Sequence, residues 1–306
     1  MEIEEMTPSV YTQSFQITHV YNTVDFNLLN AYKVENVHFL SFNDKKRRIG
    51  IILGQQGHQM FCPFSAPFGG FSFNKSQRLS CINMAVEALR NYAQSNRLTV
   101  KIALPPMFYA PQQLAETANC LNRFGKLRYM ELNYHFPISA FSHYEDIIER
   151  NAKKNLHHSL KENFEFMAVE SKDHGNIEKA YDVIRRNRKE KGYPLRMTFQ
   201  DVEKTTQLVQ ADFFLLLHDG NEVAAAQVFH VAKDIAQVIY WGDLREYSSL
   251  RPMNFFTYKL FEYYYQKGLK ILDIGPSTED GIPNFGLCDF KTSIGCVPTP
   301  KFVFEL

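Results

Sequence analysis

The sequence predicts an α/β protein made of two similar domains, each a mostly antiparallel mixed sheet flanked by helices. Its length of 306 residues suits two domains of about 100–200 residues each. Strand and helix patterns follow one another in a similar order in both halves. Landmark residues also recur about 170 residues apart, as Gly125 and Gly295 do. A repeated order at a repeated spacing indicates duplication of one domain.

The C-terminal half gives the clearer pattern. The segment FEFMAVE (164–170) is rich in aromatic and β-branched residues, which favour a strand. Asp219-Gly220 is typical of a tight hairpin turn. Pro252 and Gly268 stand where a helix would begin and end. The predicted elements are strand 164–170, helix 176–192, helix 198–209, two strands within 212–234, strand 235–244, helix 252–268, strand 269–275, helix 284–295 and strand 301–306.

The N-terminal half repeats this order. Its predicted elements are three strands within 39–71, helix 76–97, strand 98–106, helix 111–125 and strand 127–138. Residues 142–163 then join the two halves. The predicted domains are therefore 1–141 and 142–306, the second beginning with a basic linking helix.

Composition excludes several classes of protein. Lys and Arg number 34 against 33 Asp and Glu, which argues against a chain that binds nucleic acid over its whole body. The start, MEIEEMTPSV, does not resemble a signal peptide, and no apolar run approaches the roughly 20 residues of a membrane span. The five cysteines form no CxxC pair, so we expect neither a zinc site nor a disulfide framework. We expect a cytoplasmic protein without a metal and without integral membrane contact.

Four segments carry a family resemblance. They are RNAKKNLHHSLK (150–161), YWGDLREYSSLRP (240–252), LDIGPS (272–277) and DFKTSIG (289–295). Their order and spacing resemble the GNAT acyltransferases, and two such domains in tandem resemble the Fem-type peptidyltransferases. The resemblance covers nearly all of the chain as an order of elements, and about the last seventy residues as motifs.

The resemblance implies a donor, acyl-CoA or aminoacyl-tRNA, held where strands 235–244 and 269–275 part. Donor-binding positions would be Gly242 on the strand edge and Arg251, Asn254 and Phe255 at the start of the next helix, where free N–H groups bind phosphate. CoA-using members carry a glycine-containing loop at this point. The stretch SSLRPMNFF has no glycine, and Pro252 lacks an N–H. An aminoacyl-tRNA donor and a degenerate site therefore remain open.

Asp273 and Tyr240 are the candidate catalytic residues. Asp273 lies within the apolar stretch ILDIG, where a carboxylate is costly unless it is paired or faces a cleft. Burial there would raise its pKa, as a general base requires. The alternative is a structural ion pair with Lys291 or Lys270. Tyr240 would donate a proton or orient the donor, or would simply belong to the core.

Two further residues near these motifs are candidates for substrate binding. Trp241, the only tryptophan, would line the acceptor site or simply pack. Lys291 would hold a phosphate or a carboxylate of the substrate, with Phe290 anchoring its helix. The alternative for Lys291 is an ordinary exposed lysine.

Two basic clusters interrupt the nearly neutral charge. Arg150, Lys153 and Lys154, with His157, His158 and Lys161, fall on one face of a predicted helix, opposite an apolar stripe of Ile148, Ala152, Leu156 and Leu160. The second cluster includes Arg188 and comprises Arg185, Arg186, Arg188, Lys189, Lys191 and Arg196. Either cluster would hold an anionic group, such as tRNA phosphates, a nucleotide-sugar pyrophosphate or a carboxylated acceptor. A solvated helix face is the alternative.

The N-terminal domain is predicted to lack catalytic groups, because Leu104 stands near the position equivalent to Asp273. The segment CPFSAPFGGFSF (62–73) forms either a wall of an acceptor cleft or a turn-rich connector. We therefore expect transfer of an acyl or aminoacyl group to an amine or hydroxyl of a small molecule or cell-envelope precursor. The alternative is a non-catalytic binding module that has lost donor binding.

Overall fold

The computed structural model describes residues 1–306, whose contacts divide them into two compact units. Unit 1 comprises residues 1–132, 278–282 and 299–306, and unit 2 comprises residues 133–277 and 283–298. The strands β7 (Lys126–Pro137) and β15 (Val297–Glu305) contribute residues to both units. The last eight residues thus group with unit 1, whereas the sequence boundary at 141/142 assigned them to the C-terminal half.

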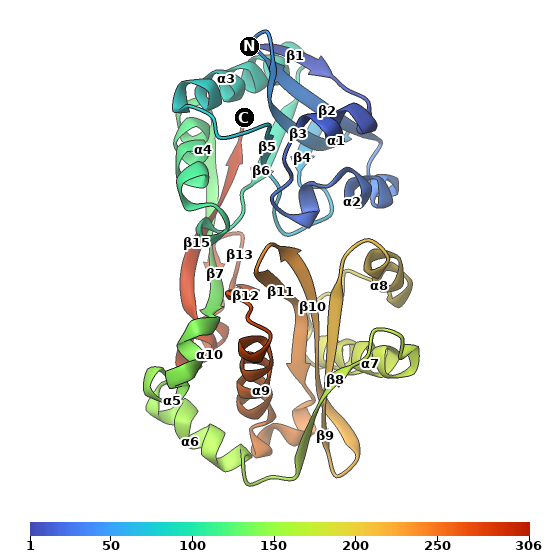
Figure 1. Ribbon diagram of the computed structural model, residues 1–306, viewed down its shortest axis with the longest axis vertical. Coiled ribbons are helices and arrows are strands. Elements are labelled where there is room, and N and C mark those ends of the chain that lie inside the picture. Colours follow the sequence, from blue (N-terminus) through green and yellow to red (C-terminus); the bar gives the residue numbers. More distant parts are fainter. The chain divides into compact units, whose positions relative to one another are not determined.

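Unit 1 has helices on both faces of its strands (Figure 1). The strands are ordered β1-β2-β3-β4-β6 and then the end of β15, with β5 paired to β3. Phe39 and Leu40 are consecutive in β2 and therefore point to opposite faces, yet both are buried, because α1 covers one face and α3 and α4 the other. The elements are β1 (Glu2–Glu5), α1 (Pro8–Ser14), η1 (Val20–Asn22), α2 (Val24–Leu29), η2 (Ala31–Lys33), β2 (Asn36–Asn43), β3 (Arg47–Gln56), β4 (Gln59–Cys62), β5 (Phe71–Phe73), α3 (Leu79–Ser95), β6 (Thr99–Ala103), η3 (Met107–Tyr109), α4 (Pro111–Phe124) and β13 (Thr278–Glu279).

Unit 2 repeats this plan, with α9 on one face of its strands and α7 on the other (Figure 1). The strands are ordered from the end of β7 through β12, β11, β10 and β9 to β8. Phe214 and Leu215 are consecutive in β9 and both fully buried, as two covered faces require. The elements are η4 (Ile138–His143), α5 (Tyr144–Ile147), α6 (Arg150–Ser159), β8 (Phe164–Val169), α7 (His174–Lys191), α8 (Phe199–Thr206), β9 (Ala211–His218), β10 (Asn221–Ala232), β11 (Ile235–Asp243), η5 (Arg245–Leu250), α9 (Pro252–Gln266), β12 (Ile271–Pro276), β14 (Ile282–Pro283, which begins in unit 1) and α10 (Phe285–Ser293).

The predicted α/β fold, with two similar domains and mixed sheets, is confirmed. Local signals placed the element ends well. Thr198 forms a capping box with Asp201, and Gly268 follows α9 with a φ of 72°. The short elements β1, α1 and α2 were not predicted, because none carries a long periodic pattern.

One predicted strand was too long. Within 58–70 only Gln59–Cys62 form a strand, and a loop that begins at the cis Cys62–Pro63 bond then runs to β5, which starts at Phe71. None of the helices is both long and apolar enough to cross a membrane.

Candidate active site

The central strands of unit 2 separate after three residues. β11 and β12 are parallel partners at Ile235↔Ile271, Ala236↔Leu272 and Gln237↔Asp273 only. β11 nevertheless continues to Asp243 and β12 to Pro276. We call this divergence the fork. Beyond Gln237, the edge of β11 that faces β12 has no strand partner, as the sequence resemblance implied.

Asp273 lies at the point of divergence and is fully buried. One carboxylate oxygen accepts from Asn133 Nδ2 at 2.7 Å and from the backbone N–H of Gly275 at 2.9 Å, and the other accepts from Gln237 Nε2 at 2.8 Å. The bond to Gly275 curls the chain, which there adopts a φ of 71°. β12 also carries one extra residue relative to β7 between Asp273 and Pro276. Both features turn β12 away from β11.

Lys291, on α10, fastens the turned end of β12. Its buried ammonium donates to the carbonyls of Ile274, Gly275 and Pro276 at 2.8, 2.9 and 3.0 Å. Burial lowers its pKa to about 8, although nearby Cys296 and Asp273 act in the opposite direction. Lys291 is therefore not the ordinary exposed lysine that the sequence left open as the alternative to substrate binding. Lys270 instead forms an exposed ion pair with Asp234 at 2.8 Å, so it is not the partner of Asp273.

A cation without a carboxylate partner lies beside the end of β11. The guanidinium of Arg188, on α7, is 5.0 Å from the ring centre of Tyr240 and 5.8 Å from that of Tyr193. Its Nε is buried and has no hydrogen-bond partner. Burial lowers the pKa of this guanidinium. Binding of an anion to such a guanidinium is favourable, because the anion accepts charge-assisted hydrogen bonds from it.

Tyr240 is positioned by a bulge in β11. Gln227↔Tyr240 and Val228↔Val238 are successive pairs with β10, so Ile239 is an extra residue. Ile239 and Tyr240 consequently both pack on the α7 face. The Tyr240 hydroxyl accepts the backbone N–H of Arg196 at 3.2 Å, and burial raises its pKa.

Gln227 was missed by the sequence reasoning. It is fully buried opposite Tyr240, and neither polar atom of its amide has a partner. An unsatisfied buried amide is costly and is expected where a ligand or water completes it. The signal was present, because Gln227 is the one polar residue in the run VAAAQVF.

Two neighbouring positions in β11 have structural explanations. A Cβ at Gly242 would lie 2.4 Å from the Asn187 side chain, which donates to the carbonyl of Asp243 at 2.6 Å. Gly242 is thus needed for the approach of α7 to β11. Trp241 is half-buried. Its ring centre lies 6.5 Å from that of Phe290, so this aromatic contact packs β11 against α10.

The start of α9 has fewer free N–H groups for a donor phosphate than was predicted. Pro252 has no N–H, and the N–H of Asn254 donates to the carbonyl of Arg251 at 3.1 Å, so the expected free amide of Asn254 is engaged. Arg251 is exposed, with a φ of 58°. The Phe255 ring packs on Phe164 of β8, at 5.3 Å, which points it away from the fork.

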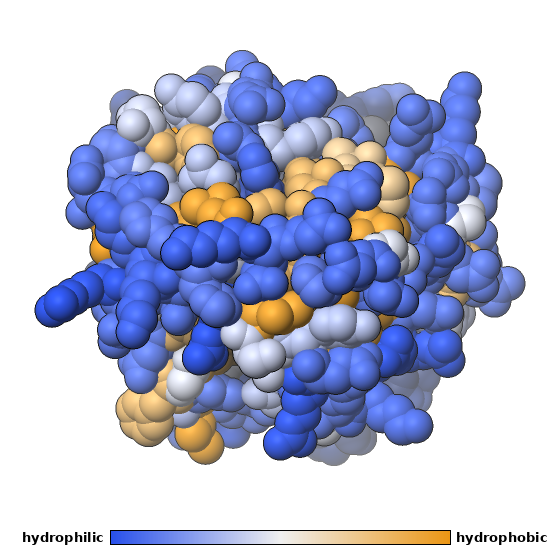
Figure 2. Space-filling model, turned by 90° about the horizontal axis from the view of Figure 1, so that it is seen from below, coloured by the Kyte–Doolittle hydropathy of each residue, from blue (hydrophilic) through white to orange (hydrophobic).

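The basic residues of α6 lie apart from the fork residues, on a helix that packs against α9. Arg150 and Lys154 are exposed, and Lys153 pairs with Glu145 at 3.2 Å. Leu160 was predicted to be part of the apolar stripe but is 45% exposed, because α6 ends at Ser159. Figure 2 shows one face of the molecule, where hydrophilic side chains separate several small hydrophobic areas.

The equivalent position in unit 1 is closed. By element order, β4 and β6 correspond to β11 and β12, and they pair from Gln59↔Thr99 to Cys62↔Ile102. The loop after Cys62 then returns, and Gly69 donates its N–H to the carbonyl of Ala103 at 2.9 Å. Gly70 donates to Cys62 Sγ at 3.0 Å. The chain itself thus occupies the place beside β6.

No group of three or more His, Cys, Asp or Glu side chains is arranged to hold a metal ion. No protein-family model and no curated protein matches the sequence. Solved structures do match the fold. A crystal structure of FemX has a TM-score of 0.68 at 12% identity, over 100% of this chain and 97% of that one.

Two further solved structures are similar in fold to this chain. The C-terminal domain of a putative lysylphosphatidylglycerol synthetase from Agrobacterium fabrum has a TM-score of 0.60 at 13% identity, over 98% of this chain and 92% of that one. A tandem GNAT protein from the clavulanic acid biosynthesis pathway has a TM-score of 0.54 at 10% identity, over 100% and 98%. The chain therefore has the tandem GNAT fold that FemX shares.

Proposed function

We propose that this chain transfers an acyl or aminoacyl group from a carrier to an amine or hydroxyl, with the reacting ester or thioester at the fork of unit 2. The observation that carries the proposal is the unpaired edge of β11 beyond Gln237. An extended donor arm can take hydrogen bonds there that a neighbouring strand would otherwise make. Unit 1 offers no such edge, since its own loop is bonded to β6.

The transfer needs few groups. The acceptor nitrogen or oxygen attacks the carbonyl carbon, and the bond to the carrier's oxygen or sulfur then breaks. The acceptor loses a proton and the leaving group gains one. Tyr240 is our candidate proton donor, because it lies on β11 beyond the last residue that pairs with β12 and carries a hydroxyl that is protonated at neutral pH. Its oxygen already accepts from Arg196, which leaves the proton to donate.

Asp273 and Lys291 are assigned positioning roles. The Asp273 carboxylate is fully buried and accepts from three N–H groups at the fork, so it holds β12 in its turned course. Lys291 completes this by binding three successive carbonyls. Our sequence hypothesis made Asp273 a general base, and the base role is the alternative that the experiments below separate.

Arg188 is the proposed anchor for an anionic group of the substrate. Its guanidinium lies close to the rings of Tyr193 and Tyr240 and has no carboxylate partner. A phosphate or carboxylate would complete its hydrogen bonds. Arg150, Lys153 and Lys154 on α6 provide a second, more exposed basic surface for a large anionic donor.

The donor is proposed to be an aminoacyl-tRNA rather than acyl-CoA. With Pro252 lacking an N–H and Asn254 engaged, the start of α9 is poorly equipped to bind a pyrophosphate. The acceptor would be a small molecule or cell-envelope precursor that carries an anionic group. FemX and the lysylphosphatidylglycerol synthetase share only the fold with this chain, so these assignments depend on the site residues.

The direct test is transfer from labelled aminoacyl-tRNA and from labelled acyl-CoA to a panel of phosphorylated or carboxylated amines. We expect transfer from aminoacyl-tRNA, and Arg188→Met should raise the KM for the acceptor about tenfold or more. Arg185→Met is the matched control, because Arg185 is exposed and pairs with Asp182. Binding of tRNA should weaken steeply as salt rises.

A second candidate function is a binding module without catalysis. The engaged amide of Asn254 and the missing glycines at the start of α9 favour it. This candidate predicts that neither aminoacyl-tRNA nor acyl-CoA raises the Tm and that neither is consumed. Turnover of either donor that is lost in Tyr240→Phe would exclude it.

A further inference from the structure

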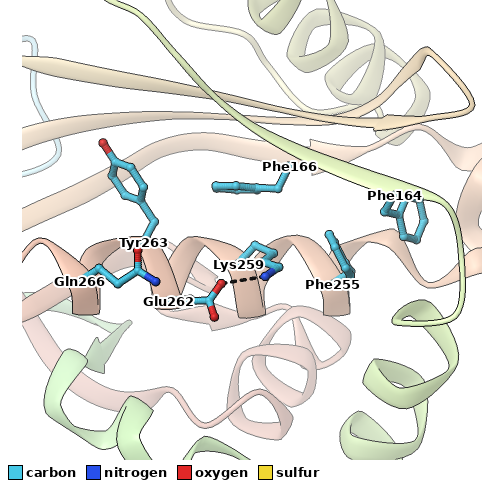
Figure 3. Close-up of a pocket in the computed structure, with 7 residues that line it drawn as sticks. All are labelled: Phe164, Phe166, Phe255, Lys259, Glu262, Tyr263 and Gln266. Carbon is cyan, nitrogen blue, oxygen red and sulfur yellow. Dashed lines mark hydrogen bonds and ion pairs between the residues drawn. The ribbon is translucent and has the colours of Figure 1, made fainter.

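A second feature of unit 2 lies at the opposite edge of its strands from β12. A groove of about 250 Å³ runs between β8 and α9 (Figure 3). One wall is a single stripe of α9 formed by Phe255, Lys259, Tyr263 and Gln266, which are spaced four, four and three residues apart. The other wall is Phe164 and Phe166, alternate residues of β8 that point toward α9.

The groove has the length of a short strand. From Phe255 to Gln266 the helix advances eleven residue steps, a rise of about 16 Å. Five residues of extended chain span about the same distance. β8 itself has six residues, so an extended segment alongside it would match both walls.

β8 is also an edge strand. It pairs with β9 over its whole length, from Phe164↔His218 to Val169↔Phe213, and with no other strand. Its second side therefore carries backbone N–H and C=O groups that no strand satisfies. An incoming segment would gain main-chain hydrogen bonds there and place alternate side chains in the groove.

The exposed charges beside β8 indicate which kind of extended segment would bind there. Glu165 is exposed on β8 and Glu170 is exposed just beyond it, and neither has an ion-pair partner. Within the groove, Lys259 is already neutralised by Glu262 at 2.8 Å. Basic side chains beside β8 would thus be favoured. A second copy of β8 would bring more carboxylates to this edge and be disfavoured.

We propose that β8 and α9 bind an extended peptide segment of a partner protein, with apolar and basic residues in alternation. The apolar residues enter the groove, and a basic residue on the other face pairs with Glu165. This site is separate from the fork and does not depend on the transfer reaction.

The test uses fluorescence anisotropy with a labelled nine-residue peptide in which lysine alternates with valine or leucine. Two control peptides keep the length: one groups the same residues into an apolar block and a lysine block, and the other replaces each lysine with glutamate. We expect the full-length chain to bind the alternating lysine peptide more tightly than either control.

Two variants locate the site. Glu165→Lys should weaken the lysine peptide about three- to tenfold and strengthen the glutamate peptide. Glu87→Lys, at an exposed site in unit 1, should change neither. Gln266→Trp should fill the groove and weaken binding of the lysine peptide, with an unchanged Tm as the check on folding. Equal affinity for the alternating and grouped peptides would overturn the proposal. Sedimentation that shows the chain to self-associate, with the association abolished by Glu165→Lys, would also overturn it, because β8 would then bind a second copy of the chain.

Discussion

Gln237 and Asp273 form the last cross-strand pair between β11 and β12, and their side chains are also hydrogen-bonded to one another, with 2.8 Å between Nε2 and Oδ2. The same carboxylate captures the backbone N–H of Gly275, two residues further along β12. One side chain therefore both closes the paired region and starts the turn away from it. The divergence of β11 and β12 is therefore stabilised by specific interactions, namely the hydrogen bonds that the buried Asp273 carboxylate accepts from three amide groups.

Asp273→Asn should lower the free energy of unfolding by about 2–4 kcal/mol, because the new amide turns two donors toward a site made of donors. Urea unfolding measures this. For transfer activity, the positioning role predicts a lower rate with the pH profile unchanged in shape. Loss of the acidic limb from the variant's pH profile, where activity falls as the base is protonated, would instead identify Asp273 as the general base.

Tyr240→Phe should reduce kcat about a hundredfold or more with little change in KM, since it removes the proposed proton donor. Stability should fall by only about 1 kcal/mol, for the lost bond from the Arg196 N–H. The matched control is Tyr181→Phe, which removes the hydroxyl that donates to Met197 in the same segment. Equal kcat losses in both variants would mean that loop packing, not proton transfer, is responsible.

Lys291 should make stability depend on alkaline pH. Burial lowers its pKa from the ordinary 10.5 to about 8, so between these values the unfolded chain carries a proton that the folded chain has released. Stability from this group therefore rises as pH increases from about 8 to 10.5 and is constant below. The free energy of unfolding of the wild type, minus that of Lys291→Met, should increase across this window. A flat difference would contradict the buried, titrating ammonium.

Gly242→Ala should destabilise unit 2, because the added Cβ would meet the Asn187 side chain at 2.4 Å. All three close atoms belong to that side chain, so Asn187→Ala should relieve much of the clash. We expect the double variant to be more stable than the sum of the two single effects predicts, by about 0.5–3 kcal/mol. Additive effects would show that Gly242 is constrained by something else.

The elements of both units could be predicted because their signals are local: caps at Thr198 and Pro252, helical spacing in 177–184 and the turn at Asp219. The roles within the site could not. Whether Asp273 is exposed to substrate or surrounded by donors depends on Asn133 and Gln237, which are distant in sequence. Arg188 looked like one cation among many in a basic helix, and only its approach to Tyr240 distinguishes it.

The loop after Cys62 sets how many donor molecules we expect one chain to bind. Although the chain contains the same arrangement of strands twice, Gly69 and Gly70 are bonded into the place that the fork leaves open in unit 2. Isothermal titration with a non-hydrolysable aminoacyl-tRNA analogue should therefore saturate at one molecule per chain, and a value of two would mean that the internal loop can be displaced.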